Sequence, residues 1–162
     1  MTQFAALLRV LSEAGVEYIV IGGVAATIHG SARNTLDVDI VYRRTPENIR
    51  RLVQALAAHR PYLRGAPPGL PFRWDEATIQ RGLNFTLTTD LGDLDTLGEI
   101  VGGGGYDALL AATEVVPAFG LECRLLRLER LIEVKRAAGR PKDFEAIAEL
   151  EIIRARRQPP AP

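Results

Sequence analysis

Two aspartates that follow a pair of glycines are the residues of this chain best suited to do chemistry. Gly22 and Gly23 end an apolar run, and thirteen residues separate them from Asp37-Val38-Asp39. On a strand, two aspartates at this spacing present carboxylates to one face, about 7 Å apart. Carboxylate oxygens are the ligands that Mg²⁺ prefers, and bare glycine backbone lets N–H groups approach a phosphate. The pattern therefore predicts a site for a nucleoside triphosphate with two Mg²⁺ ions, which neutralise phosphate charge during transfer.

A third carboxylate would complete such a site, either as a metal ligand or as the general base. Asp90, Asp93 and Asp95 lie close together later in the chain. Asp90 is typical of a turn residue. We predict Asp95 as the third metal ligand and catalytic carboxylate, because it follows an apolar residue within an expected strand. Asp93 lies two residues earlier, on the same face of the expected strand, and remains the alternative for the third carboxylate.

Polar and basic residues on either side of the aspartates are candidates for binding the triphosphate. Ser31 and Arg33 stand in the loop before Asp37, where Arg33 would contact phosphate and Ser31 would either bond phosphate or cap a turn. Near a break between two C-terminal helices, the chain carries Lys135, Arg140 and Lys142. These three side chains would hold a phosphate or form a solvated helical face, and the sequence leaves both readings open.

The elements that must position these residues alternate between strands and helices. Short β-branched runs and period-two alternation predict strands, and apolar residues at helical spacing predict helices. Thr45-Pro46 predicts a helix start, and Asp143 is predicted to cap the last helix. Gly102–Gly105 is expected to be a flexible connector, since it lacks the Lys-Ser/Thr of a P-loop. The expected strands are 18–21, 36–42, 83–89, 93–97, 114–118 and 121–126, and the expected loop at 60–71 contains four prolines and two glycines.

Length and composition limit the class of protein. The chain has 162 residues, which predicts one domain over residues 1–157 and a disordered tail over 158–162. Twenty basic residues balance twenty acidic ones, so the net charge indicates neither nucleic acid nor membrane as a partner. The single cysteine, Cys123, and the lack of a leader or of a membrane-spanning apolar run predict a cytoplasmic protein. The fold class expected is mixed α/β with a helical C-terminus.

These residues resemble the nucleotidyltransferase superfamily typified by DNA polymerase beta and the small bacterial nucleotidyltransferases. Its signature is an apolar residue, Gly-Gly or Gly-Ser, and then Asp-x-Asp on the next strand. The more detailed resemblance is to the AbiEii-type branch, with Gly-Gly-x-Ala, His-Gly-x-x-Arg-x-Thr-x-Asp-x-Asp, Gly-x-x-Asp and a C-terminal basic element. This chain matches the branch pattern at Gly22, Gly23, Ala25, His29, Gly30, Arg33, Thr35, Asp37, Asp39, Gly92, Asp95, Lys135, Arg140, Lys142 and Asp143. It departs from the pattern at Ala146, where the branch has an aspartate.

The resemblance implies a nucleotidyltransferase fold, a mixed central sheet flanked by helices, that uses Mg²⁺ and a nucleoside triphosphate donor. It also implies transfer of a nucleoside monophosphate to an unidentified acceptor, RNA, tRNA or protein, by a toxin that is paired with an antitoxin. Two other readings stay open: a catalytically inactive protein of this fold that binds a nucleotide or a partner, and an aminoglycoside-type small-molecule nucleotidyltransferase. The sequence indicates neither the preferred nucleotide nor the oligomeric state.

Overall fold

The computed structural model describes residues 1–158, so the predicted tail falls outside the described residues apart from Gln158. The helices are α1 (Phe4–Glu13), α2 (Gly22–His29), α3 (Pro46–Leu56), α4 (Glu76–Arg81), α5 (Tyr106–Leu109), α6 (Leu128–Ala138) and α7 (Pro141–Arg157), with short 3-10 turns η1 (Ala57–His59) and η2 (Leu110–Ala112). The strands are β1 (Tyr18–Ile21), β2 (Asp37–Tyr42), β3 (Tyr62–Leu63), β4 (Asn84–Thr89), β5 (Gly92–Leu97), β6 (Thr113–Ala118) and β7 (Leu121–Leu126).

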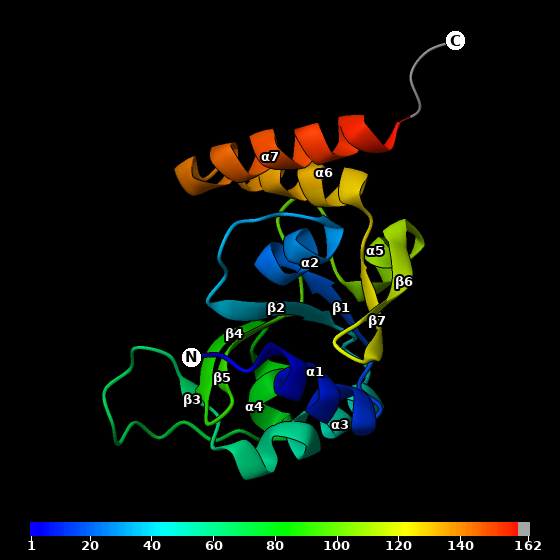
Figure 1. Ribbon diagram of the computed structural model, residues 1–162. Coiled ribbons are helices and arrows are strands. Elements are labelled where there is room, and N and C mark those ends of the chain that lie inside the picture. The colour runs from blue at the N-terminus through cyan, green and yellow to red at the C-terminus, as the bar shows by residue number, and fades with distance from the viewer. Residues whose placement is uncertain (159–162) are drawn as a thin grey trace.

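The strands form one mixed sheet in the order β3-β4-β5-β2-β1-β7-β6. β2 runs antiparallel to β1 and parallel to β5, so the two strands that carry the aspartates are neighbours. Figure 1 shows α6 and α7 as a layer above α2 on one side of the sheet, with α1, α3 and α4 on the other side. The predicted mixed α/β class with flanking helices and a helical C-terminus is confirmed.

The elements around the site form for reasons that the sequence shows. β1 is buried along its whole length, as its β-branched and aromatic run predicts. In β2, Val38 and Ile40 are fully buried, while Asp37 and Asp39 point to the opposite, partly open face. The side chain of Thr45 accepts a hydrogen bond from the backbone N–H of Asn48 and caps α3, as predicted.

Three expectations for local structure are corrected. The proline-rich loop contains strand β3, which pairs with β4 through the backbone. Residues 102–105 are not a loose connector, because the backbone N–H of Gly104 donates to the carbonyl of Ile100 and closes a turn. Asp143 does not cap α7: it lies in the first turn, after Arg140 at the N-cap position, and pairs with Arg140 instead.

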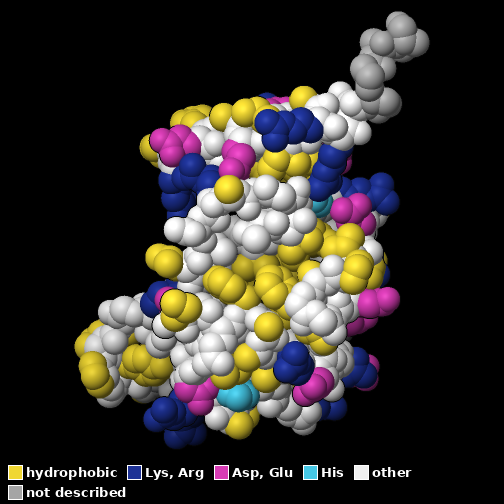
Figure 2. Space-filling model, in the orientation of Figure 1, with side chains coloured by type: hydrophobic (Ala, Val, Ile, Leu, Met, Phe, Trp, Pro, Cys, Tyr) yellow, Lys and Arg dark blue, Asp and Glu magenta, His cyan; other side chains and the backbone are white. Residues whose placement is uncertain are grey.

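The surface shows no dominance of one charge on the face in view. In Figure 2, hydrophobic side chains gather between the α6/α7 layer and the lower helices, and basic and acidic side chains are interspersed around them. This distribution agrees with the balanced charge of the chain. Within residues 1–158, none of the helices combines the length and the hydropathy needed to cross a bilayer.

Candidate active site

Three carboxylates meet at the centre of the sheet. Asp37, Asp39 and Asp95 each offer an oxygen, and these oxygens all lie within 4.8 Å of one another. The parallel register of β2 and β5 pairs Asp39 with Asp95, and so places both carboxylates on the same face. Asp93, the alternative third carboxylate, pairs with Asp37 in the ladder but does not join this group. The structure therefore places Asp95 where the sequence predicts the third carboxylate.

The crowding of these carboxylates changes their acidity. Burial, together with the nearby charges of Asp37 and Asp95, raises the pKa of Asp39 to about 8. Burial also raises the pKa of Asp37, with a further contribution from Asp95. A group of carboxylates that repel one another is an unfavourable arrangement for the empty protein, and a cation is the natural ligand for it. The donor set fits Mg²⁺, since all three ligands are hard oxygens.

The two glycines make room for residues of the site itself. Ile21 pairs with Asp39 across β1 and β2, so α2 begins directly beside Asp39. A Cβ on Gly22 would lie 2.2 Å from Asp39 Oδ2, and Gly22 has a φ of +64°. A Cβ on Gly23 would lie 2.4 Å from Thr35 Oγ1. The two glycines were predicted to expose backbone to a phosphate. Their lack of a side chain also leaves the space that the side chains of Asp39 and Thr35 occupy.

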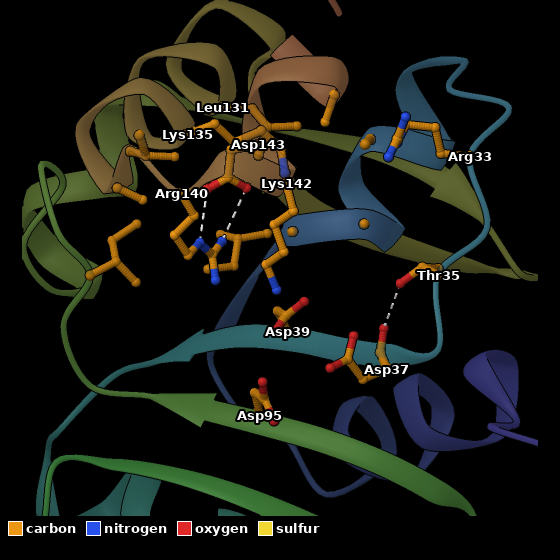
Figure 3. Close-up of a pocket in the computed structure, with 18 of the residues that line it drawn as sticks. Arg33, Thr35, Asp37, Asp39, Asp95, Leu131, Lys135, Arg140, Lys142 and Asp143 are labelled. Atoms are coloured by element: carbon orange, nitrogen blue, oxygen red, sulfur yellow. Dashed lines mark hydrogen bonds and ion pairs between the residues drawn. The ribbon is translucent and has the colours of Figure 1, made fainter. Parts of the chain in front are cut away.

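Basic side chains face the carboxylates from the helical layer. Lys135 of α6 and Lys142 of α7 line the same cleft as the aspartates, and Figure 3 shows Lys142 extending from above toward Asp39. Burial lowers the pKa of Lys135, against the opposing attraction of Asp143. Arg140 also lines the cleft, where its Nε lies 2.8 Å from Asp143 Oδ2. The two lysines and the three aspartates thus form opposite walls.

The loop before β2 is held by α7. Ser31 Oγ donates a hydrogen bond to the carboxylate of Glu149, and the backbone N–H of Ala32 donates to the same carboxylate at 3.1 Å. Arg33 forms an ion pair of 3.2 Å with Glu145. Ser31 and Arg33 line the cleft as predicted, but in this structure their side chains contact α7. A contact from Arg33 to phosphate would require it to leave Glu145.

Arg64 is a charged residue of the site that the sequence analysis missed. Its Nη2 lies 2.8 Å from Asp95 Oδ1, its Nη1 3.4 Å from Asp37 Oδ2, and its Nε 3.3 Å from Asp93 Oδ2. Nη2 also donates to the carbonyl of Leu87 at 2.8 Å. One guanidinium therefore neutralises part of the acidic cluster. In the sequence, Arg64 is one of two arginines within the expected loop at 60–71, and no motif or periodicity distinguishes it.

The three clustered aspartates and the basic side chains of α6 and α7 line one cleft of about 700 Å³ between the sheet and the α6/α7 layer. The predicted residues Gly22, Gly23, Ser31, Arg33, Asp37, Asp39, Asp95, Lys135, Arg140 and Lys142 all line it. The cleft also reaches residues outside the prediction, among them Asn84 and Glu99. Sequence positions more than a hundred residues apart are thus brought together around a single opening with an acidic floor and a basic roof.

Comparisons with solved structures agree with this fold. A candidate nucleotidyltransferase from Thermotoga maritima matches with a TM-score of 0.58, at 15% identity, over 92% of this chain and 94% of that one. An antigenic nucleotidyltransferase-like protein from Paracoccidioides brasiliensis matches with a TM-score of 0.53, at 15% identity, over 94% of this chain and 77% of that one.

At this identity the likeness shows the fold alone. The chain has the nucleotidyltransferase fold, with the acidic cluster on its central strands. No protein-family model matches the sequence, and the search of curated proteins found no relative.

Proposed function

We propose that the protein is a Mg²⁺-dependent nucleotidyltransferase, which transfers a nucleoside monophosphate from a nucleoside triphosphate to an acceptor. The observation that carries this proposal is the group of three carboxylates on one floor of a cleft whose opposite wall bears two lysines. A triphosphate with its metal ions has matching charges, since the ions would bind to the aspartates and the phosphate oxygens would pair with the lysines. The fold is one in which nucleotidyltransferase-like proteins have been described.

The residues divide into three roles. Asp37, Asp39 and Asp95 would hold the metal, and Lys135 and Lys142 would hold phosphate oxygens. Bound Mg²⁺ would supply charge neutralisation at the phosphates and activation of the attacking oxygen. Asp95 accepts the proton of the acceptor hydroxyl as the new oxygen–phosphorus bond forms. The bond between the α-phosphorus and the oxygen that bridges to the β-phosphorus breaks, and this oxygen leaves with the electron pair as part of pyrophosphate, whose negative charge Lys135 and Lys142 would stabilise.

The smaller groups of the site complete this arrangement. Gly22 and Gly23 bring the start of α2 to the cleft. Ser31, Arg33 and Arg140 would bind the triphosphate once released from their carboxylate partners on α7. Two Mg²⁺ ions, a macromolecular acceptor such as RNA, tRNA or protein, and a toxin–antitoxin role remain predictions from the sequence motifs, as do the AbiEii-like branch and the cytoplasmic location.

The proposal is tested by incubating the protein with each of the four α-labelled nucleoside triphosphates, Mg²⁺, and total cellular RNA or protein. We expect label to pass to one of these pools and to disappear when Mg²⁺ is chelated. Transfer should also disappear in the Asp39→Asn variant. Equal labelling by the wild-type protein and this variant would refute the assigned site.

The affinity for Mg²⁺ should depend on pH. Because the pKa of Asp39 is about 8 in the metal-free protein, this carboxyl is protonated at neutral pH and must lose its proton to bind a cation. Affinity should therefore rise between pH 6 and 8, by up to about tenfold per pH unit, and level off above pH 8. Calorimetry in buffers of different ionisation enthalpy should detect about one proton released per ion at pH 7. An affinity that is the same at pH 6.5 and 8.5 would contradict this assignment.

A further inference from the structure

The cleft continues beyond the carboxylates into an apolar region. Leu97 follows Asp95 by two residues on β5, so its side chain points to the same face about 7 Å farther along. Ile100 and Val101, which follow Leu97 after two intervening residues, also line the cleft. Val101 is 68% exposed, although it is an aliphatic residue. The charged floor thus leads directly into a surface of aliphatic side chains.

The loop that presents these side chains is held in place by the fold. The backbone N–H of Ile100 donates to the carbonyl of Gly104 at 2.9 Å, and the N–H of Gly104 donates back at 3.0 Å. Gly102 and Gly104 have φ values of +74° and +75°, which favour glycine. The sequence Gly102–Gly105 therefore shapes a turn, and this turn fixes the position of Ile100 and Val101.

The same loop is pressed against α6. Arg130 Nη2 donates to the carbonyl of Gly102 at 3.0 Å. A Cβ on Gly102 would lie 2.3 Å from the Cβ of Ala137, so only glycine permits this approach. The contact sets the width of the cleft between the loop and α6. The two walls of the apolar region are therefore joined by specific contacts.

The second wall is one face of α6. Leu131, Val134 and Ala138 line the cleft at helical spacing, and Lys135 lies on the same face. In Figure 3, Leu131 and Lys135 lie on this helix above Asp39 and Asp95. Leu131 and Val134 are buried, so they form the inner end of the region, whereas Val101 lies at its mouth. Lys135 marks the boundary at which the apolar region meets the charged part of the cleft.

We propose that this apolar slot, formed by Leu97, Ile100, Val101, Leu131, Val134 and Ala138, binds the nucleobase of the donor nucleoside triphosphate. The inference rests on the proposed function and specifies which part of the cleft takes which part of the substrate. A base is a flat ring with two apolar faces, joined through a sugar to a highly charged chain of phosphates. The cleft has the same division, with an aliphatic slot beside a floor of carboxylates and a wall of lysines.

The polar groups at the rim of the slot suit the edge of a base. Asn84 lines the cleft, and its Oδ1 accepts a hydrogen bond of 2.8 Å from the backbone N–H of Gly98. Its side-chain N–H groups are donors for the ring nitrogens or carbonyl oxygens of a base. Glu99 also lines the cleft and offers only acceptors when ionised. The volume of about 700 Å³ lies within the range of small-molecule sites.

The test compares two ligands that differ by the nucleoside. Binding of each of the four nucleoside triphosphates and of inorganic tripolyphosphate is measured by calorimetry, with Mg²⁺ and without any acceptor. The wild-type protein should bind at least one nucleoside triphosphate about tenfold more tightly than tripolyphosphate. In Val101→Asn, the affinity for the nucleoside triphosphate should fall to about that for tripolyphosphate, and the affinity for tripolyphosphate should be unchanged. Val101 is largely exposed, so the substitution does not remove a core contact.

The matched control is Val115→Asn, which changes an exposed valine on β6, outside the cleft. It should bind both ligands as the wild-type protein does. The inference is overturned if tripolyphosphate binds as tightly as every nucleoside triphosphate, or if Val101→Asn keeps the full preference. Failure of the wild-type protein to bind either ligand would instead refute the proposed function itself.

Discussion

Replacement of Asp39 by asparagine should abolish nucleotidyl transfer and, at the same time, stabilise the metal-free protein. Asp39 is one of the three clustered carboxylates, and an amide is a far weaker ligand for Mg²⁺. We expect a loss of transfer of about a thousandfold or more, as for removal of a principal electrostatic group. The opposite effect on stability follows from the cost of holding three carboxylates together without a cation.

The sign of the stability change follows from proton binding. Asp39 has a pKa of about 8 in the folded protein and the ordinary, much lower value when unfolded. Between these values the folded state binds more protons, so the free energy of unfolding falls as pH rises. Asparagine does not titrate, so the variant lacks this pH-dependent loss of stability. The variant should be more stable than the wild-type protein by about 1–3 kcal/mol at pH 9, with a smaller difference at pH 5.

Urea denaturation with and without Mg²⁺ measures both effects in one series. The wild-type protein should be stabilised by Mg²⁺ and the variant should not. Asp93→Asn is the control, because Asp93 pairs with Asp37 in the ladder but lies outside the clustered group. It should retain metal binding and most of the transfer. Metal-dependent stabilisation that survives in Asp39→Asn would show that the ion binds elsewhere.

Replacement of Gly22 by alanine should disable the site by moving Asp39. The added Cβ would lie 2.2 Å from Asp39 Oδ2, far inside van der Waals contact. The φ of +64° at Gly22 adds strain of about 1–2 kcal/mol for any residue with a side chain. Because Asp39 must shift, we expect transfer to fall by about a hundredfold or more.

A second glycine separates the two causes. Gly120 has a φ of +75°, and a Cβ there would meet no atom within 4 Å. Gly120→Ala therefore introduces the backbone strain without a clash, at the turn between β6 and β7. Its backbone strain should lower the free energy of unfolding by about as much as the strain at Gly22, about 1–2 kcal/mol. Transfer and Mg²⁺ affinity should be unchanged. If Gly22→Ala binds Mg²⁺ as tightly as Gly120→Ala, the clash does not displace Asp39.

Much of the fold was predictable because the signals were local. The buried run of β1 and the alternation in β2 each depend on a few neighbouring residues, and the structure confirms both. The same holds for the Thr45-Pro46 helix start. Asp37 and Asp39 could be predicted as a pair because the motif sets their spacing and strand alternation puts them on one face, whereas Asp95 could be chosen only as a candidate beside Asp93.

The corrections concern contacts between distant parts of the chain. The composition of Gly102–Gly105 predicts a flexible connector. Its backbone hydrogen bonds and its packing against Ala137 of α6, which the sequence does not show, give it a fixed shape. Asp143 reads as a helix cap, but Arg140 competes for its carboxylate through a charge-assisted hydrogen bond. Arg64 could not be found at all, since its role depends on β3 placing it beside the aspartates of β2 and β5.

The sequence by itself determined the acidic motif, the glycines before it and the alternation of strands and helices, because each depends on neighbouring residues. Only the tertiary structure decided that Asp95 joins Asp37 and Asp39, since this follows from the parallel pairing of β2 with β5. It also decided that Arg64 neutralises the cluster and that an aliphatic slot adjoins it. These features come from elements distant in the chain, and the burial of the shared core is what holds them together.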